Sequence, residues 1–371
     1  MYKIQILTNI NGVEWNNELL QSNYSTFYQT FEYLKFNTNQ DSFPVYINIL
    51  DDDEKNVGQL GILIIKTTAL YGNPFFRKIL KIISSISTRG VWLYGPIIHS
   101  KEKEKRKEIL KEIIKATQNI LEKYNLVFIE GYTSPLDNMM DEDFINEYKK
   151  NGYSERKYIT FITNLREPIE EIWKNVQRYT KTNVKRAIKR GILVKKLETF
   201  DEAKENLLLF QKWSKTKGLT ISNLNQELEK FWMRHNNGFE KTFLAYKNQQ
   251  LVSSITISCF NDIIIPLQVI NSYSIDARNL AGPALTWQAI KESKESGFRI
   301  YDITGGPELS ENEDDPDNTR PLTHYKRKWG GVKHTHYHFL KIQKKLSYRI
   351  YEKLFRMVRW YHNHSREKQI D

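Results

Sequence analysis

The chain has 371 residues, a formal net charge of +12 and an isoelectric point near 9.3. Hydrophobic residues make up 40% of it and aromatic residues 13%. This composition excludes a wholly disordered chain, and the length favours two domains. The excess of Lys and Arg favours polyanionic partners such as nucleic acid, phosphorylated carriers or anionic lipid, among which composition does not choose. One cysteine, Cys259, excludes an intrachain disulfide, and its apolar neighbours predict a buried structural thiol.

The N-terminus begins like a strand and lacks a continuous apolar segment, so we expect no signal peptide. The longest apolar runs, 60–65 and 263–267, are too short to cross a bilayer. We therefore expect a cytoplasmic protein that at most rests on the inner surface of a membrane.

Hydrophobic periodicity predicts strands and one long helix in the first half of the chain. The expected elements are strands 45–50, 58–66 and 91–94, a helix over 101–124 and a strand over 126–129. The first two strands are joined through an acidic turn and are expected to pair antiparallel. The third ends at Gly95-Pro96.

The second half repeats the order of strand meander, helix and strand. Its expected elements are a strand over 158–162, helices over 168–190, 203–216 and 224–235, strands over 242–246, 251–260 and 263–271, a helix over 283–296 and a strand over 298–303. This repetition predicts an α/β (α+β) protein with two tandem acyltransferase-like domains whose mixed sheets are mostly antiparallel. We place the domains at 1–160 and 161–342, the second with the active site, and a basic amphipathic helix at 343–371.

Two glycine pairs stand out in the second half. Gly305 and Gly306 end a strand at a point where backbone can approach a ligand closely. Gly330 and Gly331 close a segment, 325–331, in which three cations stand between two aromatic residues. The acidic, Pro-containing stretch 308–320 between the pairs predicts a mobile surface loop. Together these features predict a site.

Several segments resemble the FemABX family of aminoacyl-tRNA-dependent transferases, which build peptidoglycan cross-bridges. The matching segments are 25–34, 173–191, 281–290, 301–306 and 325–331, within about residues 22–340. The resemblance implies two tandem GNAT-like domains. It does not identify the substrate, because the wider group includes CoA-dependent relatives. Helix 224–235 is too short for the long hairpin with which some members contact tRNA, so this sequence resembles the compact form.

The resemblance places Lys326 on the lysine of the family's aromatic-Lys-x-x-aromatic-Gly motif, which implies that it stabilises the oxyanion of acyl transfer. The alternative is a solvated basic turn. In an extended segment, Lys326 and Lys328 point one way and Arg327 the other. Asp302 either orients Lys326 or the amine, or bonds the backbone as a turn residue.

Other residues complete the predicted site. Tyr325 and Tyr273 are candidate contributors to the pocket, and Lys328 assists phosphate binding. The 168–190 helix has an apolar stripe made by Ile172, Trp173, Val176, Thr180, Val184, Ala187 and Ile188. On another face lies a cationic ridge made by Arg178, Lys181, Lys185 and Lys189. The ridge either tracks phosphates or serves as a solubilising face.

Two further patterns bear on whether the protein binds a cofactor or a metal. Gly282 and Ala284 have the spacing of a GNAT pyrophosphate loop, although Pro283 removes one N–H, so a simple turn is the alternative. His334, His336 and His338 would share one face of a strand, roughly 6–7 Å apart, which suits a metal poorly. We expect no metal.

Segments 75–83 and 344–366 combine apolar stripes with cations and either lie on an anionic membrane or pack on the protein.

The resemblance therefore implies an acyltransferase that moves an aminoacyl group from charged tRNA to an amine of a phosphorylated or lipid-linked cell-wall precursor. No other cofactor and no stable protein partner is implied. One alternative is a CoA-dependent N-acyltransferase with acyl-CoA as donor. Another is a non-catalytic binder of polyanions or of a membrane surface.

Overall fold

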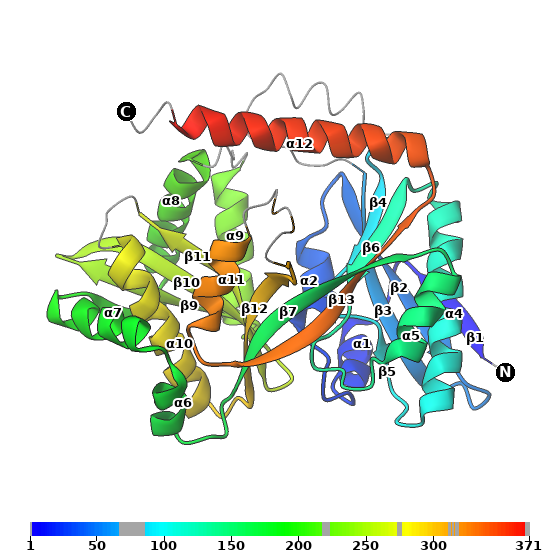
Figure 1. The fold of residues 1–371 in the computed structure, drawn as a ribbon, viewed down its shortest axis with the longest axis horizontal. Coiled ribbons are helices and arrows are strands. Elements are labelled where there is room, and N and C mark those ends of the chain that lie inside the picture. Colours follow the sequence, from blue (N-terminus) through cyan, green and yellow to red (C-terminus); the bar gives the residue numbers. More distant parts are fainter. Residues whose placement is uncertain are drawn as a thin grey trace. The chain divides into compact units, whose positions relative to one another are not determined.

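A computed structural model describes residues 2–66, 86–216, 223–272, 277–310, 313, 315 and 319–367. The chain forms two compact units (Figure 1). Unit 1 comprises residues 1–157 and 336–371, and unit 2 comprises residues 158–335. The chain leaves unit 1 within strand β7 (Ser154–Asn164) and returns to it within strand β13 (Val332–Ile342), so the C-terminal segment is part of unit 1.

Unit 1 is built on a mostly antiparallel sheet. Its strands are β1 (Lys3–Leu7), β2 (Ser42–Leu50), β3 (Asn56–Ile65), β4 (Arg89–Trp92), β5 (Ile97–Ile98), β6 (Phe128–Tyr132) and the end of β13. They run in the order β1-β2-β3-β4-β6-β13, with β5 beside β3. Only the β4–β6 pair among these is parallel. The predicted hairpin is confirmed, with Val45 opposite Ile62.

Helices cover this sheet through apolar faces. They are α1 (Gly12–Leu19), the 3₁₀ helix η1 (Phe27–Gln29), α2 (Phe31–Phe36), α4 (Lys103–Lys123), α5 (Glu142–Lys150) and α12 (Lys345–Glu367). The predicted long helix is confirmed as α4, whose apolar residues at helical spacing are buried against the sheet. Segment 25–34 is divided between η1 and α2 at Thr30, whose Oγ1 accepts the Tyr33 N–H as an N-cap.

A buried ion pair lies under α4. The Arg106 side chain is 2% exposed, and its Nη2 donates to Asp137 Oδ2 over 2.6 Å. Its Nη1 donates to the carbonyls of Ile98 and Ser100, each over 3.2 Å. Burial raises the pKa of Asp137, and the nearby guanidinium opposes that shift. The pair thus joins the start of α4 to two loops through charges that depend on each other.

Replacing Arg106 with Met is expected to lower the free energy of unfolding by about 3–5 kcal/mol, because it leaves the Asp137 carboxyl buried without its cation. Urea unfolding measures the loss. The double variant Arg106→Met, Asp137→Asn removes both charges and should recover part of it. A loss below about 1 kcal/mol would contradict this account of the pair.

Unit 2 also contains a mixed, mostly antiparallel sheet. Its strands are β7 from Tyr158 onward, β8 (Leu193–Lys196), β9 (Glu240–Lys247), β10 (Gln250–Phe260), β11 (Ile263–Asn271) and β12 (Ile300–Pro307). They run in the order β7-β12-β11-β10-β9-β8. The predicted meander of β9, β10 and β11 is confirmed, and β11 pairs parallel with β12. The predicted fold class is therefore confirmed in both units.

The helices of unit 2 are α6 (Ile169–Asn175), α7 (Arg178–Lys189), α8 (Phe200–Thr216), α9 (Leu224–Asn236), the π-helical turn η3 (Ala277–Ala281), α10 (Gly282–Glu295) and α11 (Arg320–Arg327). Figure 1 shows α6, α7 and α10 grouped on one side of this sheet, and α8 and α9 together at another.

The single helix predicted over 168–190 is wrong, because the backbone breaks between α6 and α7. Val176 and Gln177 are extended, with ψ of 135° and 146°. The Gln177 N–H bonds to the Lys328 carbonyl over 2.9 Å instead of continuing the helix. A Cβ on Gly330 would lie 2.4 Å from the Asn175 carbonyl oxygen, so the 328–330 turn fits closely against this break.

The extended conformation assumed for 325–331 is also wrong, because this segment begins inside helix α11. Pro321 occupies the first turn of the helix, where a missing N–H costs nothing. Asp315 accepts the N–H groups of Thr319 and Arg320 over 2.9 and 2.8 Å. The side chains of α11 therefore follow a helical period, which changes which of them share a face.

Candidate functional site

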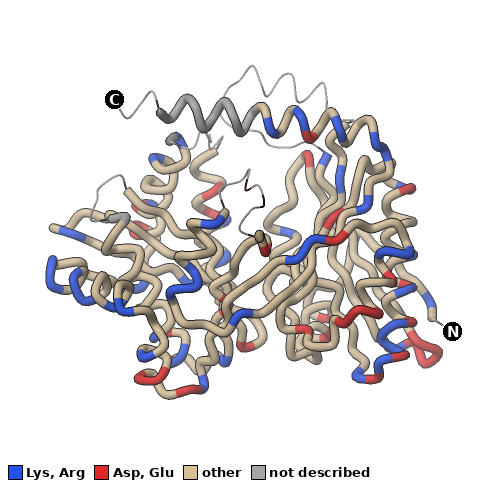
Figure 2. The backbone as a smooth tube through the Cα atoms, in the orientation of Figure 1, with Lys and Arg blue, Asp and Glu red and all other residues tan. Residues whose placement is uncertain are grey.

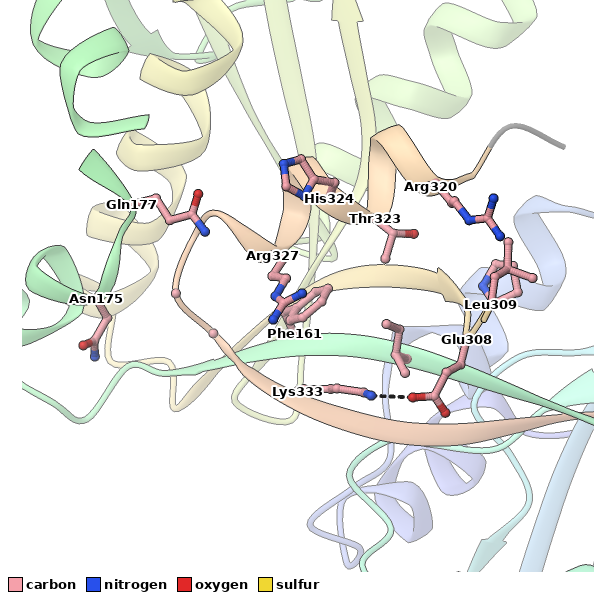
Figure 3. A pocket seen from close by; sticks show the side chains of 14 residues that line it. Phe161, Asn175, Gln177, Glu308, Leu309, Arg320, Thr323, His324, Arg327 and Lys333 are labelled. Carbon is pink, nitrogen blue, oxygen red and sulfur yellow. Dashed lines mark hydrogen bonds and ion pairs between the residues drawn. The ribbon is translucent and has the colours of Figure 1, made fainter. Parts of the chain in front are cut away.

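A pocket of about 660 Å³ opens beside α11 in unit 2 (Figure 3). Its lining residues come from β7, the α6–α7 break, the end of β12, α11 and the start of β13: Ile159, Phe161, Asn175, Gln177, Pro307, Glu308, Leu309, Arg320, Thr323, His324, Arg327, Gly330, Gly331 and Lys333. Apolar side chains line part of the pocket, and helix α11 contributes a cationic wall. Such a pocket suits an anionic ligand with an apolar part.

One face of α11 supplies the cationic wall. Arg320, Thr323, His324 and Arg327 recur at helical spacing and all line the pocket (Figure 3). Arg320 Nη2 donates to the carbonyls of Ser310 and Glu313 over 2.6 and 2.5 Å. Arg327 was among the three cations singled out in the sequence, but Arg320, Thr323 and His324 were not, because 308–320 was expected to be a loop and 325–331 to be extended. Helical spacing after Pro321 is the signal that would have identified them.

An ion pair between Lys333 and Glu308 spans another part of the pocket (Figure 3). It offsets one cation, so that Arg320 and Arg327 remain as the cationic groups in excess among the lining residues. Since a guanidinium presents a rigid fork of donors, these two side chains are well suited to phosphate or carboxylate oxygens.

Lys326 lies on a neighbouring face of α11 and is directed at strand β12. Its Nζ donates to Thr304 Oγ1 and, over 3.4 Å, to the Gly305 carbonyl. Burial lowers the pKa of the half-buried Lys326 ammonium to about 8, against an opposing effect of Asp302. Lys326 itself does not line the pocket, but Arg327 beside it and Pro307 at the end of β12 both do. The solvated-turn alternative does not describe this lysine.

Asp302 is fully buried and bonds local groups. Its Oδ1 accepts the Thr160 hydroxyl of β7 and, over 2.8 Å, the Thr304 N–H. Thr304 has φ of 65°, which is unfavourable for a β-branched residue. Asp302 therefore holds the strained turn that presents the Thr304 hydroxyl to Lys326. This arrangement fits both roles weighed for Asp302, as turn residue and as the residue that orients Lys326.

The paired glycines allow neighbouring segments of the protein to pack closely against their backbone. A Cβ on Gly305 would lie 1.7 Å from the Ile159 carbonyl oxygen, and one on Gly306 would lie 2.6 Å from Thr323 Oγ1. Gly331 faces the backbone of β7 in the same way, at 3.0 Å. Gly330 and Gly331 line the pocket, whereas Gly305 and Gly306 are not among its lining residues. The assignment of Gly305 and Gly306 to substrate binding stays a prediction.

Tyr325 and Lys328, two further candidates of the 325–331 segment, contact aromatic side chains of unit 2. Tyr325 packs on the core of unit 2 and contacts Trp329 edge to face, with ring centroids 6.3 Å apart. Burial raises its pKa. Lys328 places its Nζ 5.7 Å from the centre of the Tyr179 ring. Neither side chain lines the pocket, so their predicted direct roles remain predictions.

The cationic ridge of α7 lies opposite the buried face of that helix. Arg178, Lys185 and Lys189 are exposed, whereas Thr180, Val184 and Ala187 are buried. Figure 2 marks the Lys and Arg positions along α7 in blue. Lys181 turns back and donates to the Lys174 carbonyl over 2.9 Å. Ile188, which the sequence pattern places in the apolar stripe, is 70% exposed, because it lies at the edge of the face that Thr180, Val184 and Ala187 bury.

The segment predicted to bind a pyrophosphate is helical on both sides instead of being a loop that opens a helix. Gly282 and Ala284 are buried, and helical backbone already precedes them in η3. The first N–H groups of α10 therefore continue a helix instead of forming an open N-terminus. The pyrophosphate role stays a prediction that this conformation does not favour.

Tyr273 and the 75–83 segment lie outside the described residues, as does part of the predicted loop 308–320.

The remaining candidates are the single cysteine and the histidines of β13. Cys259 is buried, and burial raises the pKa of its thiol to about 12. His336 packs against Tyr94, and His338 Nε2 lies 3.1 Å from Glu130 Oε2. The described part of the chain contains no group of three or more His, Cys, Asp or Glu side chains placed to hold a metal ion. Within that same part, no helix is both long and apolar enough to cross a membrane.

No protein-family model and no curated protein matches this sequence. Solved structures match its fold over nearly the whole chain. A FemX structure has a TM-score of 0.67 at 13% identity, covering 93% of this chain and 99% of its own. The fold is FemX-like. This agrees with the resemblance to the FemABX family at the level of the fold.

Two further structures show the same architecture. A tandem GNAT protein from the clavulanic acid biosynthesis pathway has a TM-score of 0.54 at 9% identity, covering 92% of this chain and 98% of its own. L-PGS from Bacillus licheniformis has a TM-score of 0.53 at 14% identity, covering 95% and 98%. At these identities the likeness is one of fold.

Proposed function

We propose that this protein is an acyltransferase that moves an aminoacyl group from charged tRNA to an amine of a phosphorylated or lipid-linked cell-wall precursor. The observation that carries the proposal is Lys326, a desolvated ammonium held by Thr304 and Gly305 next to a cationic pocket. The FemX-like fold supports the choice of reaction class.

The reaction requires charge stabilisation at one oxygen. The acceptor amine attacks the ester carbonyl carbon, a C–N bond forms, and the carbonyl oxygen becomes an oxyanion. Collapse of this intermediate breaks the bond to the ribose oxygen, which leaves with the proton that the amine gives up. A cation next to the oxyanion lowers the barrier because its partner charge develops only in the transition state. Lys326 is the cation that we assign to this task.

The pocket suits the donor. Arg320 and Arg327 would hold phosphate or ribose-linked oxygens of the tRNA end, while Phe161 and Leu309 would contact the apolar parts. The start of α10 is buried and follows the helical backbone of η3, a conformation that does not favour binding of a CoA pyrophosphate. We therefore favour charged tRNA over acyl-CoA as the donor.

The deciding experiment incubates the purified protein with a mixed pool of aminoacyl-tRNAs, or with acetyl-CoA, and an amine-bearing muropeptide precursor. New amide product is detected by mass spectrometry. Product from the tRNA pool alone supports the proposal. Product from acetyl-CoA alone would replace it with the CoA-dependent alternative, and failure with both, together with retained binding of polyanions, would favour a binding protein.

Replacing Arg178, Lys185 and Lys189 with Gln is expected to weaken tRNA binding about 10-fold or more at low salt and to reduce the slope of log affinity against log salt, because exposed cations release counterions from phosphates. Filter binding across a salt series measures both. A matched variant, Lys105→Gln, Lys111→Gln, Lys115→Gln on α4, makes the same change in net charge. Equal losses in the two variants would return the α7 ridge to a solubilising face.

A further inference from the structure

Helix α12 presents two different apolar faces. Tyr348 and Tyr351 contact the buried Phe128 ring, with centroids 5.1 and 5.3 Å away, and thereby hold the helix on unit 1. On another face, Leu346 is 73%, Ile350 38% and Met357 50% exposed. These three residues recur at intervals of four and seven, which places them in one stripe along the helix.

Cations accompany this exposed stripe. Lys353 lies within it by helical spacing, while Arg349 and Arg356 lie along one side of it, and all three are exposed. Helix α12 contains six Lys and Arg residues against two Glu. Glu352 bonds Arg356 over 2.9 Å. The face thus combines exposed apolar side chains with one cation, Lys353, and carries two more cations along one side.

Helix α4 of the same unit shows that this arrangement is particular to α12. It also carries exposed lysines, among them Lys105, Lys111 and Lys115, but its large apolar side chains are buried in the core of unit 1. A cationic face without exposed apolar residues attracts counterions and does not insert. An exposed apolar stripe alongside cations suits a bilayer surface, where the side chains enter the acyl boundary and the cations meet anionic headgroups.

We propose that the Leu346, Ile350 and Met357 face of α12 docks unit 1 on an anionic lipid bilayer. The helix lies in the plane of the interface, with its aromatic face remaining on the protein. Charge complementarity selects the lipid, because the cations beside the stripe need negative headgroups. This inference concerns a surface in unit 1 and does not depend on the transferase activity proposed for unit 2.

The test measures sedimentation of the full chain with large unilamellar vesicles. Equimolar phosphatidylcholine and phosphatidylglycerol vesicles should bind the protein, and pure phosphatidylcholine vesicles should not. Arg349→Gln, Lys353→Gln, Arg356→Gln should weaken binding more than about 10-fold, since each cation near an anionic surface contributes severalfold. Leu346→Ser, Met357→Ser should weaken it by a comparable factor through lost apolar contact.

The α4 variant Lys105→Gln, Lys111→Gln, Lys115→Gln serves as the control of equal charge, and it should bind within about twofold of wild type. Circular dichroism checks that each variant keeps its helical content. The proposal fails if wild type does not sediment with phosphatidylglycerol vesicles, or if the α4 variant loses as much binding as the α12 variant. It also fails if the α12 variant keeps vesicle binding and loses affinity for RNA, which would make this face a nucleic-acid surface.

Discussion

Lys326→Met is expected to lower kcat by on the order of 10²–10³, or about 3–4 kcal/mol in barrier, while the protein stays folded. The substitution removes the ammonium that reaches Thr304 Oγ1 and the Gly305 carbonyl, and it approximately keeps the length of the side chain. Turnover with the donor identified for the protein, measured beside the melting temperature, separates chemistry from folding. We expect no loss of stability above about 1 kcal/mol, because methionine approximately keeps the apolar stem and removes a charge that burial disfavours.

Lys328→Met is the matched control, since it makes the same exchange two residues away on a side chain that contacts the Tyr179 ring. Its effect on kcat should be within about 10-fold, because a cation–π contact at a partly exposed position is weak. Equal losses in the two variants would mean that Lys326 has no special role in the transition state. A large fall in melting temperature for Lys326→Met alone would assign it to the fold.

The pH dependence of turnover distinguishes two forms of Lys326. Burial lowers its pKa to about 8. If the ammonium stabilises an oxyanion, the rate is highest below pH 8 and falls as the pH rises through this value. If the neutral amine acts as a base, the rate rises through the same value. Stability should show the same pKa, because the unfolded lysine keeps its proton up to about 10.5. Wild type should therefore gain stability relative to Lys326→Met between pH 8 and 10.5.

Hydrophobic periodicity predicted most of the fold because the elements bury one face each. The meander of β9 to β11 and helix α4 are confirmed, since their patterns depend only on neighbouring residues. The break between α6 and α7 was not predictable in the same way. It depends on two residues about 150 positions away in the sequence. The Lys328 carbonyl accepts the Gln177 N–H, and Gly330 packs closely against the Asn175 carbonyl.

The sequence identified only some of the candidate site residues, because their grouping depends on the conformation of the 320–331 segment. Lys326 stands out by its motif, and the structure gives it a desolvated position. Arg320 and His324 did not stand out, and Arg327 was not grouped with them, because the assumption of an extended chain separates residues that a helix gathers on one face. The glycine pairs stood out in the sequence, but a sequence does not say whether a missing side chain makes room for a ligand or for another strand.

Gly305→Ala is expected to lower the free energy of unfolding by more than about 3 kcal/mol. The added methyl group would lie 1.7 Å from the Ile159 carbonyl oxygen, 2.6 Å from the Ile159 carbonyl carbon and 2.9 Å from the Thr160 Cα. These are backbone atoms of β7, which pairs with β12 at this point, so no side-chain rotation relieves the overlap. The two strands must separate, and Asp302 and Thr304 would move with β12.

Gly191→Ala is the control for this substitution, because Gly191 has φ of 74° and no atom within 4 Å of its Cβ position. It should cost only about 1 kcal/mol, the conformational penalty of a left-handed helix end. Guanidinium unfolding of both variants compares overlap with backbone strain. Since Thr304 presents its hydroxyl to Lys326, Gly305→Ala should also lower turnover in the fraction that remains folded. If the two substitutions cost the same, β12 does not lie as close to β7 as these distances require, and the turn that holds Lys326 would need a different explanation.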